Sequence, residues 1–178
     1  GMAFDSQPVI SPSGEKIAFI SDRNGRNNLW IADINGSNPI QLSDETYTRM
    51  LSPAWTTDSN YVTVTQRGKE IELKQYHVDG GSGTTVSQAD DDNSNPPGVG
   101  AAFSPDGNTV YFAEKLGSPD APTEDFPVTQ IVRLNLNDGS RLQVTRGEGG
   151  AVRPKISPDG KLLIYGTRYQ TQTGLRVR

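Results

Sequence analysis

Short apolar segments separated by turn residues run along the whole chain, and one phrase of this kind occurs four times. Each copy has an apolar segment, a turn of the Ser-Pro-Asp-Gly type and a second apolar segment, at residues 8–19, 53–64, 103–112 and 154–165. In such a turn, Pro presets φ, Asp bonds its own backbone and Gly supplies a positive φ. An apolar segment on each side of the turn predicts a β-hairpin.

The phrases recur at a nearly regular spacing. Equivalent apolar positions follow one another at intervals of 45, 48 and 53 residues, at Ile10, Trp55, Phe103 and Ile156. The blades of β-propellers repeat every 40–50 residues, roughly. Loop insertions at 88–97 and 117–127 account for the two longer intervals.

A second hairpin completes each repeat. Its first strand ends in Asn-Gly or Asp-Gly, the strongest short hairpin signal, in the segments 29–36, 73–80 and 131–139. A further short strand follows each of these turns, at 40–43, 84–87 and 142–145. Four antiparallel strands at this period describe one propeller blade.

The predicted fold is therefore all-β, a partial β-propeller of four-stranded antiparallel blades over residues 1–178. Three blades are complete and about half of a fourth follows, with boundaries near 4–45, 49–88, 98–146 and 151–178. In the fourth copy a polar loop follows Tyr169, and the third strand begins at Leu175, just before the last residue, Arg178.

The place where the repeats stop predicts association. Propellers usually close with 4–8 blades, roughly, so we expect further blades to follow in a longer protein. Residues 1–3, Gly-Met-Ala, look like the remainder of a cleaved tag, and an upstream segment is expected too. Unfinished blade edges and open faces favour contact with other blades or between copies of the chain.

Composition narrows the function classes. The net charge of -4 argues against a nucleic-acid surface. No apolar segment approaches the roughly 20 residues of a membrane helix. The chain has no cysteine, which excludes disulfides and thiolate metal sites but leaves the compartment open.

A catalytic constellation is absent from the sequence. His77 is the only histidine, too little for a metal site or a triad. The segment 104–107, Ser-Pro-Asp-Gly, is a turn, and no Gly-x-Ser-x-Gly or phosphate-binding glycine motif occurs. We therefore expect neither catalysis nor a bound cofactor in this chain.

One acidic cluster is a weak metal candidate. Asp90, Asp91 and Asp92 could offer oxygen ligands to Ca²⁺, but their spacing does not match an EF-hand loop. With the Ser-Asn-Pro-Pro that follows Asn93, the cluster is more typical of a solvated loop between blades.

The strand closest to the channel offers the best candidate surface for a ligand or partner. In a propeller the first strand of each blade is innermost and borders the central channel. The residues just before these strands are, by repeat position, Gln7, Ser52, Gly100 and Arg153, with Arg49 just upstream of Ser52. Arg can hold a carboxylate or phosphate with two hydrogen bonds. The alternative is that these residues only close loops. Aromatic residues at repeat-equivalent positions, Tyr165 among them, are expected to pack between blades.

The repeat resembles a known family. The recurrent Ser-Pro-Asp-Gly turn, with an upstream Pro and a downstream Asn-Gly or Asp-Gly, is similar to TolB-like propeller repeats, distant relatives of WD repeats, over essentially the whole chain. Several segments look like blades of propellers that precede a metal-dependent amidohydrolase domain, at 4–8, 20–25, 28–31, 149–154, 165–168 and 173–178. That resemblance implies a catalytic domain, and any metal, downstream of this chain.

Three functions stay open on these grounds. The first is a non-catalytic propeller module that docks against an amidohydrolase domain or gates its substrates. The second is a free-standing periplasmic TolB-like scaffold for protein partners. The third is a propeller that gates a serine peptidase of the prolyl-oligopeptidase kind. The resemblance implies a periplasmic or secreted bacterial protein, with a cytoplasmic one as the alternative.

Overall fold

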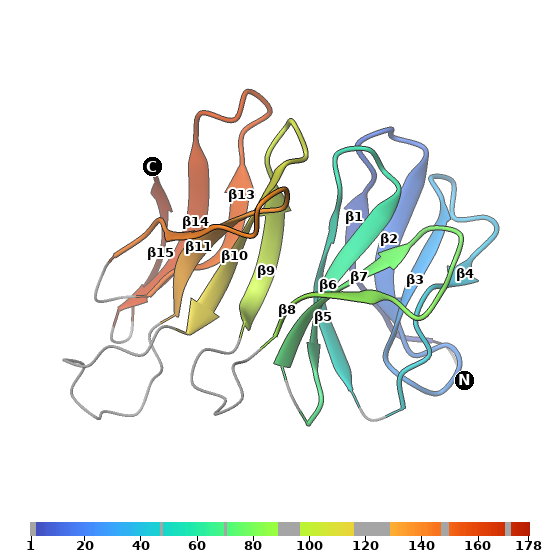
Figure 1. Cartoon of the computed structure of the whole chain (residues 1–178). Helices are drawn as coiled ribbons and strands as arrows, with labels where there is room; N and C mark the ends of the chain where they lie inside the picture. The colour runs from blue at the N-terminus through green and yellow to red at the C-terminus, as the bar shows by residue number, and fades with distance from the viewer. Residues whose placement is uncertain are drawn as a thin grey trace. The chain divides into compact units, whose positions relative to one another are not determined.

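The chain is all-β, as the sequence predicts (Figure 1). The computed structural model describes residues 3–46, 48–69, 71–88, 97–115, 129–146, 150–169 and 172–178. Four antiparallel sheets, the blades of a β-propeller, make up this part of the chain. The chain divides into two compact units, Gly1–Gln88 and Ala89–Arg178, and each is described by itself.

Unit 1 holds two four-stranded blades. In each blade the strands lie in sequence order and every neighbour is antiparallel. The first blade consists of β1 (Asp5–Ile10), β2 (Lys16–Ser21), β3 (Asn28–Asp33) and β4 (Ile40–Gln41). The second consists of β5 (Arg49–Trp55), β6 (Tyr61–Arg67), β7 (Ile71–His77) and β8 (Thr84–Gln88).

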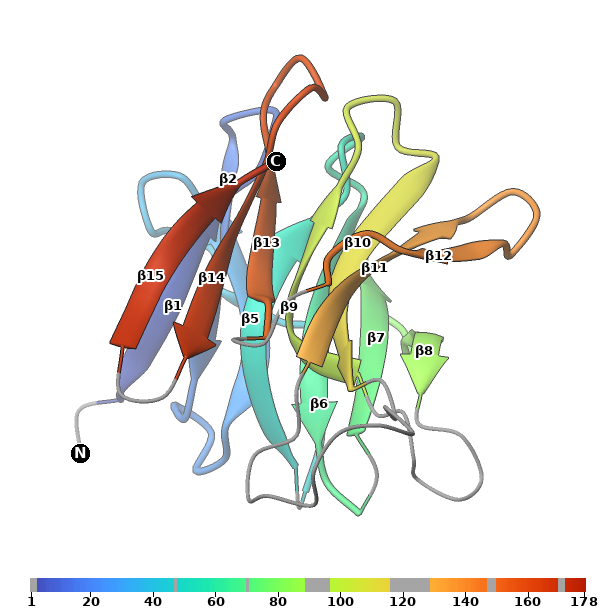
Figure 2. The ribbon, with the colours of Figure 1, turned by 90° about the vertical axis from the view of Figure 1, so that its left-hand side faces the viewer.

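Unit 2 holds a third four-stranded blade and a three-stranded sheet (Figure 2). The third blade consists of β9 (Pro97–Phe103), β10 (Thr109–Lys115), β11 (Thr129–Asn135) and β12 (Arg141–Gln143). The fourth consists of β13 (Val152–Ile156), β14 (Leu163–Tyr169) and β15 (Gln172–Val177).

The third strand of the fourth blade is longer than the sequence predicts. Strand β15 begins at Gln172 and not at Leu175, and it pairs with β14 from Ile164↔Val177 to Tyr169↔Gln172. The polar residues assigned to a loop continue the ladder because a strand needs backbone partners, and β14 supplies them regardless of side-chain polarity.

Each unit has its core between its two blades. In unit 1, Ala18, Ile20, Leu29 and Ile31 of the first blade pack against a set from the second, namely Met50, Trp55, Val62, Val64 and Tyr76. In unit 2 the buried cluster is smaller and consists of Ala113, Ile131, Ala151 and Leu163. Aromatic packing between blades is thus confirmed for Trp55.

One face of the fourth blade carries exposed apolar side chains. Leu175 is 80% exposed, Val177 is 61% exposed, and Ile164 lies directly opposite Val177 on β14. Arg176, which alternates with them, points to the other side, toward the third blade. This open apolar face suits the predicted contact with other blades or copies, which remains a prediction.

The Ser-Pro-Asp-Gly segments are turns in which the hydroxyl is already engaged. Ser104 Oγ donates a hydrogen bond to Asp106 Oδ1 at 2.5 Å, and the backbone N–H of Asn108 donates to the same oxygen at 3.1 Å. Thr56 with Asp58 and Ser157 with Asp159 repeat the arrangement. The predicted turns are confirmed, and in each case the hydroxyl group adds a hydrogen bond to the Asp carboxylate.

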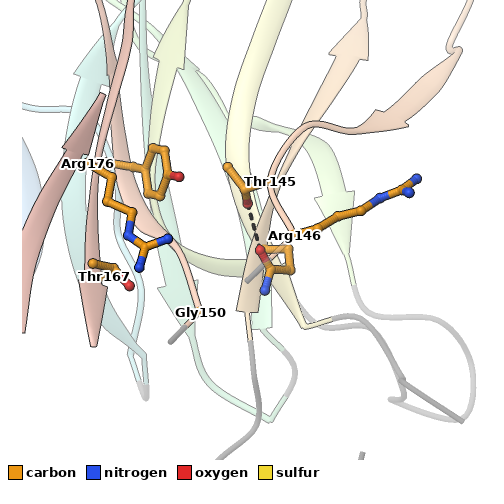
Figure 3. Close-up of a pocket in the computed structure, with 7 residues that line it drawn as sticks. Thr145, Arg146, Gly150, Thr167 and Arg176 are labelled. Carbon is orange, nitrogen blue, oxygen red and sulfur yellow. Dashed lines mark hydrogen bonds between the residues drawn. The ribbon is translucent and has the colours of Figure 1, made fainter. Parts of the chain in front are cut away.

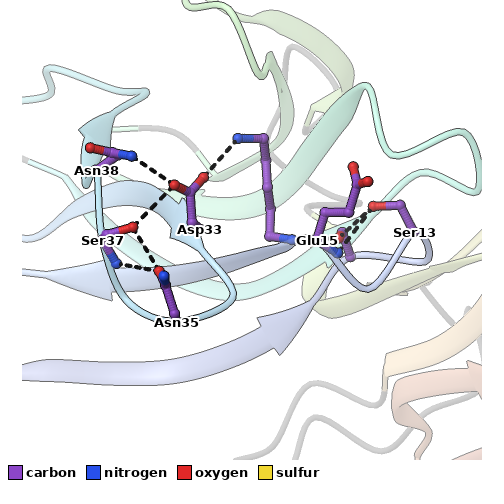
Figure 4. A network of polar contacts seen from close by, with 8 residues as sticks. Ser13, Glu15, Asp33, Asn35, Ser37 and Asn38 are labelled. Atoms are coloured by element: carbon purple, nitrogen blue, oxygen red, sulfur yellow. Dashed lines mark hydrogen bonds and ion pairs between the residues drawn. The ribbon is translucent and has the colours of Figure 1, made fainter.

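The Asn-Gly turn of the first blade has its own carboxylate anchor (Figure 4). Asp33 accepts hydrogen bonds from Asn38 Nδ2 at 2.7 Å and Ser37 Oγ at 3.2 Å, and its Oδ1 lies 3.4 Å from Lys16 Nζ. These donors, Asn38 first, lower the pKa of Asp33 below its ordinary value.

We expect the turn carboxylates to make stability depend on acid pH. Hydrogen bonds from the Thr or Ser hydroxyl hold the pKa of Asp58, Asp106 and Asp159 below the ordinary 3.8. A lowered pKa contributes stability that is present above the unfolded value and is lost as pH falls through the folded one. The free energy of unfolding in urea should therefore fall as the pH drops below about 5.

A triple variant isolates this effect. Asp58→Asn, Asp106→Asn and Asp159→Asn together should flatten the acid limb of the curve, because an amide does not titrate there. Asp44→Asn is the control, since exposed Asp44 lies outside these turns. An unchanged slope in the triple variant would show that other carboxylates carry the dependence.

Candidate functional site

The innermost strand of every blade is interrupted by a bulge at the predicted channel position. The register of pairing with the second strand shifts within β1, β5 and β13. In the third blade it shifts in the pairing of β9 with β10. Each of the four equivalent residues has a positive φ, at 56° for Gln7, 53° for Ser52, 96° for Gly100 and 52° for Arg153. This conformation is costly for residues other than glycine, so its recurrence marks a built feature of the repeat.

The bulges of adjacent blades touch within each unit. In unit 1, the side-chain oxygen of Gln7 accepts a hydrogen bond from the backbone N–H of Ser52 at 2.8 Å. In unit 2, a Cβ placed on Gly100 would lie 2.8 Å from Cα of Arg153. The structure thus brings Gln7 to Ser52 and Gly100 to Arg153.

Arg49 does not join these contacts. It lies at the start of β5, directly opposite Arg67 on β6, and both side chains are exposed. Gln7 and Arg153 are also exposed, whereas Ser52 is half-buried. Packing between blades therefore accounts for part of the predicted set, and binding by the exposed Arg49, Gln7 and Arg153 remains a prediction.

Unit 2 contains a polar pocket between its two blades (Figure 3). The space among its lining residues is about 210 Å³, a value that includes open solvent. The lining residues are Gln130, Thr145 and Arg146 from the third blade, and Gly150, Tyr165, Thr167 and Arg176 from the connection and the fourth.

The floor of the pocket is hydrogen-bonded and rigid. Thr145 Oγ1 donates to Gln130 Oε1 at 2.7 Å and accepts from the backbone N–H of Ile131 at 2.8 Å. Both side chains are more than nine-tenths buried. In Figure 3 the guanidinium of Arg176 extends toward Thr167 and Gly150, whereas the side chain of Arg146 points away from the pocket.

The other candidates offer no metal site in the described residues. His77 Nδ1 accepts a hydrogen bond from the backbone N–H of Asp79 at 3.1 Å, and its ring meets Tyr61 edge-on at 4.8 Å. Asp90, Asp91 and Asp92 lie outside the residues that the structure describes. Over the described ranges, no group of three or more acidic or histidine side chains could hold a metal ion.

Sequence reasoning missed the pocket. It assigned Tyr165 to packing, which the contact of this residue with the core of unit 2 confirms, and it gave no role to Thr167 or Arg176 as pocket residues. The available signal was the alignment of the repeats, which places Thr145 of the third blade at the position of Ser43 in the first.

Solved structures with this fold span several activities. The chain superposes on TolB from Acinetobacter baumannii with a TM-score of 0.77 and 18% identity, over 98% of this chain and 41% of that one. The fold is that of a TolB-like β-propeller. A chain from a structural study of two prolyl endopeptidases superposes over 99% of this chain and 28% of its own, with a TM-score of 0.66 and 16% identity. At these identities the likeness shows the fold alone.

Comparison by sequence finds two relatives of this chain among named proteins. No family model matches the chain. An uncharacterized peptidase of Bacillus subtilis, YuxL, is 26% identical over 165 residues, which make up 90% of this chain and 21% of that protein. A putative tricorn-like protease N-terminal subunit of Sulfurisphaera tokodaii is 53% identical over 32 residues. The chain thus has the fold of a TolB-like propeller and is similar in sequence to part of a peptidase, and it spans about a fifth of YuxL. Within its described residues, no helix is suited to crossing a membrane.

Proposed function

We propose that this chain is the non-catalytic propeller segment of a larger hydrolase, where it docks against a catalytic domain and restricts the substrates that reach it. The observation that carries the proposal is the alignment of nine-tenths of the chain with only 21% of a peptidase. A propeller that forms a minor part of a hydrolase needs no catalytic residues of its own.

The structure of the turns supports the non-catalytic part of the proposal. A hydrolytic serine needs a base within hydrogen-bonding distance, whereas Ser104 and Ser157 each donate to an aspartate of their own turn. Hydrogen bonds from these hydroxyl groups lower the pKa of Asp106 and Asp159, so both carboxyl groups are held in the ionised form.

Two chemistries are proposed for the attached domain. The peptidase alternative is supported by the similarity to YuxL. The amidohydrolase alternative is supported by the sequence resemblance of the first and fourth blades, and the relatives named above do not test it. A metal in the downstream domain and an exported location belong to this second alternative and stay predictions.

An access assay on the complete protein tests the gating role. Gln7→Ala and Arg153→Ala change exposed side chains at the predicted channel. We expect them to alter kcat/KM for a long substrate severalfold and to leave a short substrate with the same scissile bond unchanged, because only the long one must pass the propeller.

Arg133→Ala is the matched control, since Arg133 is exposed on β11, outside the bulges. Equal effects on both substrates, or none on either, would contradict gating. Full activity of residues 1–178 alone toward either substrate would contradict the non-catalytic assignment.

A further inference from the structure

The two units contain the same polar motif at the connection between their blades. In unit 1, Ser43 Oγ accepts from the backbone N–H of Leu29 at 2.9 Å and donates to Asn28 Oδ1 at 2.9 Å. Thr145 and Gln130 repeat this pattern in unit 2. The side chains of Gln41 and Gln143 also donate to the carbonyls of Ser43 and Thr145, at 2.6 and 2.8 Å. The two connections can therefore be compared position by position.

In unit 1 a carboxylate fills the space beyond this motif. Glu45, two residues after Ser43, accepts from Lys74 Nζ at 3.1 Å and lies 3.3 Å from the Tyr76 hydroxyl. The Lys74 and Glu45 side chains are only 17% and 26% exposed. Partial burial strengthens such a charge-assisted hydrogen bond.

Unit 2 has a basic residue at the position that corresponds to Lys74. Lys74 lies opposite Val64 on β6, and Arg176 lies opposite Tyr165 on β14 in the equivalent register. Arg178, at the position of Tyr76, donates from its guanidinium to the carbonyl of Val144. Arg176 has no ion-pair partner among the described residues.

The acidic side differs in sequence. Two residues after Thr145 stands Gly147, where unit 1 has Glu45. Gly147 lies outside the described residues, so the comparison here is of sequence alone. A glycine supplies no carboxylate, whereas the pocket beyond Thr145 retains Arg176 in its lining, together with Tyr165 and Thr167.

We propose that this pocket of unit 2 binds the carboxylate group of a separate molecule, in the place that Glu45 occupies in unit 1. Arginine presents a planar pair of donors that matches a carboxylate, and it stays charged at all relevant pH values. The pocket opens to solvent and the Arg176 side chain is exposed, so a carboxylate group can reach the guanidinium from outside. The group can come from a free small acid or from an acidic side chain of a peptide segment. This proposal does not depend on the hydrolase assignment.

The test is a titration of the chain followed by amide chemical shifts. Sodium acetate should shift the amide signals of Gly150, Thr167 and Arg176 in a saturable manner, whereas acetamide, its neutral counterpart, should not. A capped tripeptide with central Glu, compared with its Gln version, distinguishes the two sources. Saturation by acetate and by the Glu peptide indicates a site that admits peptide side chains, and saturation by acetate alone indicates a free small acid.

Variants decide whether Arg176 is the binding group. Arg176→Gln should weaken acetate binding at least about tenfold, because a hydrogen bond to a charged group is lost, and the matched control Arg133→Gln should leave it unchanged. Glu148→Gln is measured too, because this carboxylate is two residues from Gly150 in sequence. Tighter binding by that variant would support a carboxylate pocket.

Three results would overturn the proposal. They are equal shifts with acetate and acetamide, full acetate binding by Arg176→Gln in a chain whose remaining spectrum is unchanged, and no saturable shift in either the unsubstituted chain or Glu148→Gln.

Discussion

Gly100→Ala should lower the free energy of unfolding of unit 2 by about 2–5 kcal/mol. Two costs add at this position. The φ of +96° is strained for any residue with a Cβ, and the new Cβ would lie 2.8 Å from Cα of Arg153, which is backbone and cannot rotate away. The measurement is urea unfolding followed by circular dichroism, because Trp30 and Trp55 both lie in unit 1 and their fluorescence reports on that unit.

Gly139→Ala is the matched control in the same unit. Its φ is +72°, but nothing lies within 4 Å of the added Cβ, so only the conformational cost of about 1–2 kcal/mol is expected. Equal losses in the two variants would mean that the bulge of the third blade does not pack against that of the fourth.

Tyr76→Ala should destabilise unit 1 by about 3–5 kcal/mol, the range for removing a large buried aromatic side chain. Tyr76 is 2% exposed and belongs to the core between the first two blades. Its hydroxyl lies 3.1 Å from Gln66 Oε1 and 3.3 Å from Glu45 Oε1. Tyr76→Phe, which removes the hydroxyl alone, should cost about 1–2 kcal/mol. Tryptophan fluorescence during urea unfolding measures both.

Alkaline pH gives a second readout at Tyr76. Burial, and then the Glu45 carboxylate, raises the pKa of the Tyr76 phenol above its ordinary value of 10.0. A raised pKa contributes stability that is present below the unfolded value and is lost as pH rises through the folded one. Tyr76→Phe should therefore reduce the loss of stability above pH 10.0. Tyr61→Phe, at a 37% exposed position, is the control, and a larger effect there would contradict this account.

The blades were predictable because each is specified locally. The turn of Ser104 to Gly107 supplies its own hydrogen bonds between side chain and backbone, so the residues that mark it in the sequence also build it. The start of β15 was placed wrongly because its first residues are polar. Their place in the sheet is set by backbone pairing with β14. The pattern of apolar residues in the sequence does not predict that pairing.

The equivalence of the four candidate positions could be predicted from the repeat, and their conformation could not. The repeat predicted Gln7, Ser52, Gly100 and Arg153 just before each first strand, whereas the structure places all four within that strand, at positive φ. Only Gly100 suggests this conformation by residue type, since Gln, Ser and Arg rarely adopt it. The pocket depends on Arg176 and Tyr165 lying opposite each other on two strands, and this register follows only once both strands have been placed.

The contact between neighbouring bulges limits how these blades could be recombined. The first blade offers a glutamine oxygen to the backbone of the blade that follows it, whereas the third offers a bare glycine against which the fourth packs closely. A first blade spliced in front of the fourth would introduce a side chain where no room exists, and a third blade in front of the second would leave the Ser52 N–H without its acceptor. Engineered shuffling that exchanges single blades in these ways should therefore fail.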